Sequence, residues 1–222
     1  HKRAKKQPLL FTPDAALFGT KPYANDKTTK ELVDLFQRDL DGCLHHQNDP
    51  LATAKALSNL ALVHCEAGDL TPALGLYKKC LSERQTHLGD NDIRTWQTQL
   101  NLGKVLQATG DLDAAVACTR TAYQRMESVL GWHHDNVLDA ALGLATVLVK
   151  RDGERDESVA ESLLRKTVDG RKRTLGISRA PKTLAAMSML ARLLVRQLQR
   201  KTGEVRSLLD KSSPSQRDIR IE

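Results

Sequence analysis

A pattern of twelve residues occurs twice in this sequence at a fixed interval. NLALVHCEAGDL at residues 59–70 is followed by NLGKVLQATGDL at residues 101–112, which is a step of 42 residues. The Leu of the pattern and its small neighbour recur after further steps of 42 and 46 residues, which places the small residues at Ala61, Gly103, Ala145 and Ala191. A period of this length indicates a row of similar units that bury their apolar sides against one another.

The second half of each unit repeats independently of the first. A glycine precedes an alanine by five residues in the first two units and by seven in the third, and a Leu-Gly pair follows; the alanines are Ala73, Ala115 and Ala160. The spacing predicts two amphipathic helices per unit, since glycine at Gly68 or Gly110 ends the first helix in a left-handed conformation. Asp69 and Asp111 are then expected to cap the second helix. The small residues let the helices approach closely.

Composition favours helix throughout. Of the 222 residues 40% are hydrophobic but only 4% are aromatic, a balance that is typical of an all-α fold. No apolar run approaches the ~20 residues of a membrane span, so we expect a soluble protein without one. The cysteines show no close-paired spacing, which favours a reducing, intracellular compartment over a disulfide framework or a zinc site.

At these positions the sequence resembles the tetratricopeptide repeat family, and more closely its long-period kinesin light chain type. The family pattern of the first unit is matched by Leu60, Ala61, Gly68, Ala73, Tyr77 and Cys80, and that of the second by Leu102, Gly103, Gly110, Ala115, Thr119 and Ala122. LGISRAPKTL at residues 175–184 is similar to the family's linker, with Ala180 in place of its His. The resemblance covers roughly residues 30–201 and implies an α-solenoid of helical hairpins wound as a right-handed superhelix.

The periodicity divides the chain into three parts. We expect residues 1–27 to be an extended basic N-terminal arm, residues 28–210 the helical repeat domain and residues 211–222 a C-terminal tail. The repeat domain begins with a cap helix at 28–46, followed by hairpins at about 51–86, 92–128, 134–173 and 181–210. In the last hairpin we expect a long helix to about residue 201 and a short one over 204–210.

No enzymatic motif stands out. The sequence contains no phosphate-binding Gly-rich loop, HExxH or G-x-S-x-G, so we expect no catalytic residue and no cofactor. His45 and His46 near Cys43, and the pair at residues 133–134 beside Asp135, do not predict a metal site, because neighbours on a helix point apart. We expect these histidines to be exposed or capping.

The concave groove that the resemblance implies is the first candidate site. Asn59 and Asn101 match the family position whose amide holds the backbone of an extended peptide, and an amide offers both a donor and an acceptor. One turn later Leu62 and Lys104 share that face, followed by Glu66. The alternative is that both Asn side chains bond a neighbouring helix.

The C-terminal third carries the second candidate site. The formal net charge is +7, and twelve basic residues against two acidic ones lie between Arg165 and Arg206. Arg192, Arg196 and Arg200 recur every fourth residue and so occupy one helix face. Together with the basic run of Arg171, Lys172 and Arg173 they are the expected anionic-partner face. A solvated outer face is the alternative. No aromatic residue follows Trp132, so any contact with RNA would be to its backbone rather than its bases.

The N-terminal arm is the third candidate. Its apolar residues favour docking against a partner over a solvated tail; they are Leu9, Leu10, Phe11, Leu17, Phe18 and Tyr23. The chain begins with His1, which fits a processed protein, and an organelle such as the mitochondrion is then the expected compartment; a trimmed chain would begin in the same way, and the cytoplasm is the alternative.

Two classes of function follow from these features. The first is a non-catalytic scaffold that mediates protein–protein contacts as an accessory subunit of a large assembly, with a peptide-binding cargo or chaperone adaptor as a variant. The second is an RNA-contacting accessory protein of a ribonucleoprotein, such as an organellar ribosome, that uses the basic C-terminal face.

Overall fold

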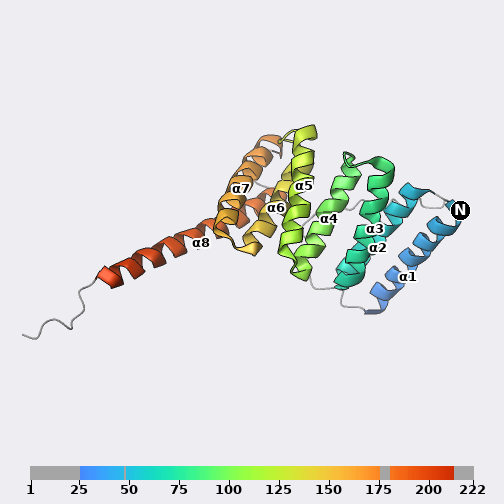
Figure 1. Cartoon of the computed structure of the whole chain (residues 1–222), viewed down its shortest axis with the longest axis horizontal. Coiled ribbons are helices and arrows are strands. Elements are labelled where there is room, and N and C mark those ends of the chain that lie inside the picture. Colours follow the sequence, from blue (N-terminus) through green and yellow to red (C-terminus); the bar gives the residue numbers. More distant parts are fainter. Residues whose placement is uncertain (1–25, 48, 176–180, 213–222) are drawn as a thin grey trace, which may run out of the picture.

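The computed structural model describes residues 26–47, 49–175 and 181–212. Every element within these ranges is helical, and the predicted all-α solenoid is confirmed (Figure 1). The elements are α1 (Asp26–Gly42), the π-helical turn η2 (Cys43–Gln47), α2 (Pro50–Ala67), α3 (Leu70–Leu88), α4 (Ile93–Thr109), α5 (Leu112–Leu130), α6 (Asp135–Arg151), α7 (Glu154–Leu175) and α8 (Pro181–Ser212).

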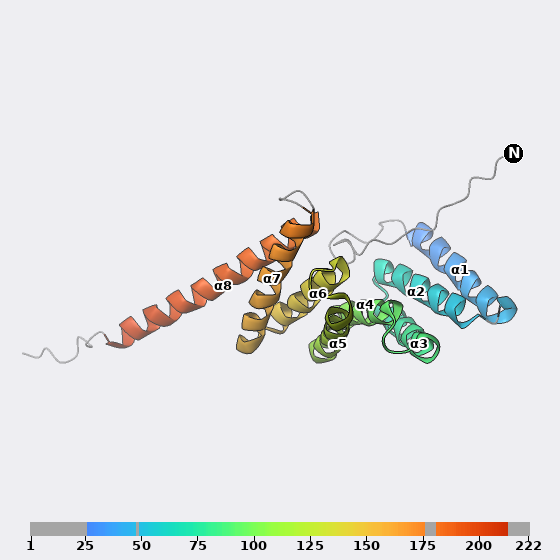
Figure 2. The ribbon, with the colours of Figure 1, turned by 90° about the horizontal axis from the view of Figure 1, so that it is seen from above.

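Consecutive helices pack as antiparallel hairpins in a row. The pairs are α2 with α3, α4 with α5 and α6 with α7, and each hairpin packs on the next through α3 with α4, α5 with α6 and α7 with α8. Figure 2 shows the row as an arc, with α4 and α6 toward its inner side and α3 and α5 toward its outer side. α1 covers α2 at one end, and α8 projects beyond the stack at the other (Figure 1).

The turns inside the hairpins follow from single residues. Gly68 and Gly110 adopt φ of 86° and 91°, the left-handed region that lets a helix end without a clash. In the third hairpin Asp152, not the neighbouring glycine, takes this conformation, at φ 61°. Of the two expected Asp caps, that of Asp111 is confirmed and that of Asp69 is wrong. Asp111 accepts a hydrogen bond from the Ala114 N–H at 3.2 Å. Asp69 makes no side-chain cap bond, and its carboxylate lies 3.5 Å from His64 Nδ1.

Small residues set the distance between the two helices of a hairpin. A Cβ added at Gly103 of α4 would lie 2.5 Å from Thr119 Cγ2 of α5, so only glycine fits there. Ala61 and Ala145 at the equivalent positions are fully buried. The prediction for the fourth small residue, Ala191, is wrong, because within the described part of the chain no second helix packs on that side and Ala191 is exposed.

The helix boundaries differ from the expected ones mainly at the two ends. The cap helix ends as α1 at Gly42 and continues through η2. The expected break between residues 201 and 204 is absent, since α8 runs unbroken through Gly203. A glycine inside a helix costs only about 1 kcal/mol relative to alanine, which leaves the helix intact.

None of the described helices is long and apolar enough to cross a membrane. All four cysteines are free thiols. In the described ranges no three His, Cys, Asp or Glu side chains come together as metal ligands.

Candidate functional site

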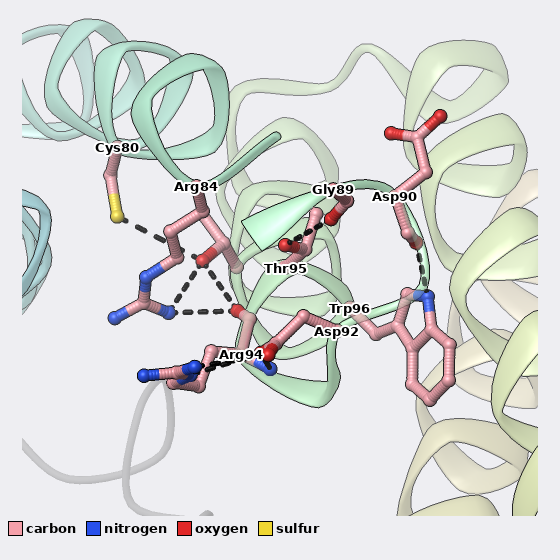
Figure 3. A network of polar contacts seen from close by, with 9 residues as sticks. Cys80, Arg84, Gly89, Asp90, Asp92, Arg94, Thr95 and Trp96 are labelled. Carbon is pink, nitrogen blue, oxygen red and sulfur yellow. Dashed lines mark hydrogen bonds and ion pairs between the residues drawn. The ribbon is translucent and has the colours of Figure 1, made fainter. Parts of the chain in front are cut away.

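Hydrogen bonds across the junction between the first two hairpins hold α4 against α3. Arg84 of α3 donates hydrogen bonds from Nη1 to the Arg94 carbonyl at 2.8 Å and to Thr98 Oγ1 at 2.7 Å (Figure 3). The buried Trp96 donates from Nε1 to the Asp90 carbonyl at 2.7 Å (Figure 3). These bonds join the end of α3 to the start of α4, and a rigid junction of this kind places the side chains of α4 relative to those of α2.

The expected groove residues lie on the first helices of two adjacent hairpins. Asn59, Leu62 and Glu66 belong to α2, whereas Asn101 and Lys104 belong to α4. All five side chains are half-buried, so each keeps part of its surface accessible. The two asparagines occupy equivalent positions 42 residues apart and are therefore repeated in the same orientation along the stack. We call the side of the arc that carries these residues the inner face.

Lys104 is a basic residue of the inner face that interacts electrostatically with residues of other helices. Burial lowers the pKa of its ammonium group below the ordinary value of 10.5, an effect that the carboxylate of Asp139 opposes and the charge of Lys182 reinforces. Lys104 also acts on Cys65 of α2, whose pKa burial raises to about 12. Lys104 thus interacts electrostatically with residues of α2, α6 and α8.

Asp139 of α6 is the carboxylate beside Lys104 that the sequence reasoning missed. Its Oδ2 accepts a hydrogen bond from Lys182 Nζ of α8 at 2.9 Å, and its Oδ1 accepts one from Arg171 Nη2 of α7. Burial raises the pKa of Asp139, and the hydrogen bond and charge of Lys182 and the charge of Arg171 oppose that change. Three cations, Lys104, Lys182 and Arg171, therefore act on one half-buried carboxylate, and a second carboxylate, that of Asp135, lies 3.8 Å from Lys182 Nζ.

The units that begin with α6 and α8 carry other residues at the position of Asn59 and Asn101. The repeat register places Gly143 of α6 and Met189 of α8 where Asn59 and Asn101 stand. An added Cβ at Gly143 would meet no other atom within 4 Å, so the surface there is open. Met189 receives a hydrogen bond from Thr146 Oγ1 at 3.5 Å. The paired asparagines are thus confined to the first two hairpins, with open space beside them on the third.

The expected anionic-partner face is largely engaged inside the chain. Arg196 and Arg200 form ion pairs with Asp152 and Glu157, with N–O distances of 2.6–3.2 Å. Arg171 is fully buried against Asp139 and so is no part of a surface.

The other basic residues of that face remain accessible. Lys172, Arg173 and Arg192 are exposed, and Arg173 pairs with Asp169 at 3.0 Å. The six basic residues therefore do not form one continuous surface. The apolar residues of the N-terminal arm, from Leu9 to Tyr23, lie outside the described residues.

Comparison with known proteins places the first two repeats in a family. The tetratricopeptide repeat family profile matches residues 53–94 and 97–136, which are the first two hairpins and the turns that follow them. No curated protein sequence shows significant similarity to the chain.

Solved structures agree with this match. The chain is similar to BtubC (BKLC) from P. vanneervenii, with 13% identity and a TM-score of 0.68 over 86% of this chain and 78% of that one. It is also similar to a Podosopora anserina protein described as a putative kinesin light chain with nearly identical TPR-like repeats, with 21% identity and a TM-score of 0.65 over 85% and 90% of the two chains. A substituted form of that protein matches with a TM-score of 0.67 and 20% identity, over 83% and 85%. At these identities the likeness concerns the fold alone, and together with the match over residues 53–94 and 97–136 it confirms the predicted resemblance to tetratricopeptide repeats of the kinesin light chain type.

Proposed function

Because residues 53–94 and 97–136 match the tetratricopeptide repeat family and the fold is similar to that of kinesin light chain-like repeats, a fold that serves as a protein–protein interaction scaffold, we propose that the chain binds an extended acidic segment of a partner protein. The inner face is the binding site, and the chain acts as a non-catalytic accessory subunit of a larger assembly. The observation that carries this proposal is the pair of equivalent, half-buried asparagines, Asn59 and Asn101, next to the half-buried ammonium of Lys104.

The asparagines supply the contacts to the partner's backbone. A carboxamide offers a donor and an acceptor to a peptide unit, and one amide on each of two neighbouring helices holds an extended segment at two points. Neither Asn59 nor Asn101 has a side-chain hydrogen bond to another described residue, which fits partner contact better than the alternative of bonding to a neighbouring helix.

Lys104 supplies the preference for an acidic side chain. Burial costs its charged form free energy, as the lowered pKa indicates, and the carboxylate that acts on it, that of Asp139, is already shared by Lys182 and Arg171. A partner carboxylate would relieve that cost, and a charge-assisted hydrogen bond is roughly twice as strong as a neutral one.

Gly143 leaves room for the bound segment on the third hairpin. The open surface beside it, on the helix that also carries Asp139, gives an extended chain room to continue from α4 onto α6.

Peptide display tests this proposal. A random library of peptides about 12 residues long, enough to span two hairpins in extended form, is selected against the full chain, and the selected peptides are titrated by fluorescence anisotropy. We expect sequences rich in Asp and Glu, binding that weakens at least about tenfold in Asn101→Ala and in Gly143→Leu, and selection of basic peptides by Lys104→Glu. Peptides that bind all three variants as tightly as the wild type would refute the proposal.

Matched controls lie elsewhere on the same chain. Asn91→Ala removes an exposed loop amide, and Gly75→Leu adds a side chain on α3 at a position that is equally open. Neither change should alter peptide binding. Thermal unfolding of each variant, followed by circular dichroism, separates a blocked face from an unfolded protein.

The RNA-contacting alternative receives less support. Half of the expected anionic-partner face, namely Arg171, Arg196 and Arg200, is neutralised by carboxylates of this chain. Binding to structured RNA whose log affinity falls steeply with log salt concentration would favour that alternative.

A further inference from the structure

α8 exposes an apolar stripe on the side opposite its buried residues. The stripe, which we call the α8 outer face, consists of Leu184, Met187, Ala191, Val195, Leu198 and Val205. Leu198 is 63% exposed and Val205 is 56% exposed, whereas Ala186 and Leu193 on the other side are buried against the stack. α8 is therefore apolar on two sides, like a helix that lies between two layers.

The repeat register shows what normally lies over this stripe. Residues of α8 correspond to residues of α6 that stand 46 positions earlier, so the first half of the α8 outer face corresponds to α6 residues that are all at most 2% exposed: Leu138, Ala141 and Ala145. The second helix of that hairpin, α7, packs on this side of α6, and Gly170 lies directly against Leu138. The α8 outer face is thus the side that a second hairpin helix covers in each earlier unit.

Ala191 is the most specific sign of a missing helix. Its equivalent in the second hairpin, Gly103, is contacted by Thr119 and the Ala115 carbonyl of α5. Its equivalents in the first and third, Ala61 and Ala145, are fully buried. A small residue at this position is required only where another helix approaches closely.

We propose that the α8 outer face binds an amphipathic helix of a partner protein, which lies antiparallel to α8 in the place that α7 takes on α6. The stripe from Leu184 to Val205 is about 30 Å long at ~1.5 Å per residue, enough for a helix of the length of α7. This surface is separate from the inner face, so the two proposals stand or fall independently.

Charge indicates an acidic partner. Residues 181–207 contain six basic residues and one acidic residue, Glu204, and three of the basic residues, Lys182, Arg196 and Arg200, pair with carboxylates of α6 and α7 or of the turn between them. Arg192 and Arg206 lie along one edge of the α8 outer face, are exposed and make no ion pair with another described residue. A second copy of this chain would place two such basic helices against each other, and the repulsion opposes that occupant. Acidic residues along the edges of the bound helix complement Arg192 and Arg206.

A synthetic helix gives a direct test. The probe is a fluorescent, end-blocked peptide with the sequence of residues 154–175, in which Arg165, Lys172 and Arg173 are replaced by Glu and Arg171 by Met, the residue at the equivalent place in α5. We expect it to bind the full chain and to bind Leu198→Gln at least about tenfold more weakly. Leu35→Gln on α1 removes a similarly exposed leucine at the other end of the stack and should leave binding unchanged.

Ala191→Leu separates a specific helix site from a merely apolar surface. Close packing of two helices predicts at least about tenfold weaker binding, because the larger side chain holds the helices apart, whereas nonspecific adhesion predicts tighter binding. The proposal is overturned if the wild type does not bind the probe, or if Ala191→Leu binds it more tightly.

Two further measurements test whether a second copy of the chain or a membrane covers the α8 outer face instead. Sedimentation equilibrium that shows a dimer of the wild type and a monomer of Leu198→Gln would assign the face to a second copy. Displacement of the probe by vesicles of phosphatidylcholine and phosphatidylserine would assign it to a membrane surface. Either result overturns the acidic-helix proposal, and a monomer that vesicles do not compete with supports it.

Discussion

Lys182 of α8 donates a hydrogen bond from Nζ to Oδ2 of Asp139 on α6, across 2.9 Å and 43 residues of sequence. Arg171 of α7 donates to the other oxygen of the same carboxylate. One side chain of α6 therefore holds the two helices that follow it, and it does so beside Lys104 on the inner face. The cohesion of the last helices and the charge of the candidate site depend on the same residue.

Replacement of Asp139 should destabilise the fold strongly. Asp139→Asn leaves the guanidinium of Arg171, which is fully buried, without its counter-ion, and breaking a buried pair in this way costs about 3–5 kcal/mol. Lys182→Met removes a more exposed partner and should cost less than about 1 kcal/mol. Urea unfolding monitored by circular dichroism gives both values, and equal losses would show that Asp139 does not hold Arg171.

Because Gly103 and Thr119 lie so close together, Gly103→Ala should destabilise the wild type but not a variant that lacks the Thr119 methyl group. Gly103→Ala alone places Cβ within 2.5 Å of Thr119 Cγ2, and overpacking of this kind costs roughly 1–3 kcal/mol. Thr119→Ser removes that methyl group. In this background Gly103→Ala should be neutral or stabilise by up to about 1 kcal/mol, because alanine is the better helix former. A double-mutant cycle measured by urea unfolding checks this, and additive effects would contradict the close approach.

Lys104 should oppose stability while it promotes binding. Burial lowers its pKa, so folding is less favourable with the ammonium charged, and Lys104→Met removes that cost. We expect an increase of up to about 1 kcal/mol in the free energy of unfolding at about pH 7. The same variant should bind acidic peptides from the display selection more weakly. A variant that loses both stability and binding would indicate a structural role for the lysine.

Asp156 should make the fold sensitive to acid. The hydrogen bonds from Arg151, at 2.6 Å each, hold the pKa of Asp156 below its ordinary value of 3.8. Its stabilising effect is therefore complete at pH values above that ordinary pKa and is lost as the pH falls through the lower pKa of the folded state. Asp156→Asn should cost about 2 kcal/mol at about pH 7, and the difference from wild type should shrink below about pH 4. A difference that does not change with pH would exclude this linkage.

The buried cysteines should resist alkylation. Burial raises the pKa of the Cys65 thiol to about 12 and also that of Cys80, so very little thiolate forms at about pH 8. Cys43 is half-buried and should react first with iodoacetamide. Mass spectrometry of the native protein should find Cys43 modified and Cys65 unmodified until urea is added. Early modification of Cys65 would mean that α2 opens readily.

Sequence reasoning predicts the hairpins well because they depend on local signals. A glycine or aspartate in the left-handed conformation and a small residue at a fixed spacing define each unit, and the observed helices begin and end within a few residues of the expected positions. The break expected before Gly203 is wrong, since one glycine does not end a helix in which Lys201, Glu204 and Arg206 around it favour the helical conformation.

The candidate site was harder to predict because its charges pair over long distances. The spacing of Arg196 and Arg200 shows that they share a face, but it does not show that Asp152 and Glu157 lie against it. Arg171 has a usable signal in the register, since the equivalent residue of α5, Met126, is fully buried. Extending that register one unit beyond Asn101 would also have pointed to Gly143.

The most direct test of the account is a titration of the tightest display-selected acidic peptide by isothermal calorimetry. The wild type and the double variant Asn59→Ala/Asn101→Ala are compared at equal salt concentration, and circular dichroism confirms that both are folded. We expect the double variant to bind roughly 30-fold more weakly, which corresponds to about 2 kcal/mol. Equal affinities for the two proteins would contradict the proposal that the inner face holds a partner by its backbone.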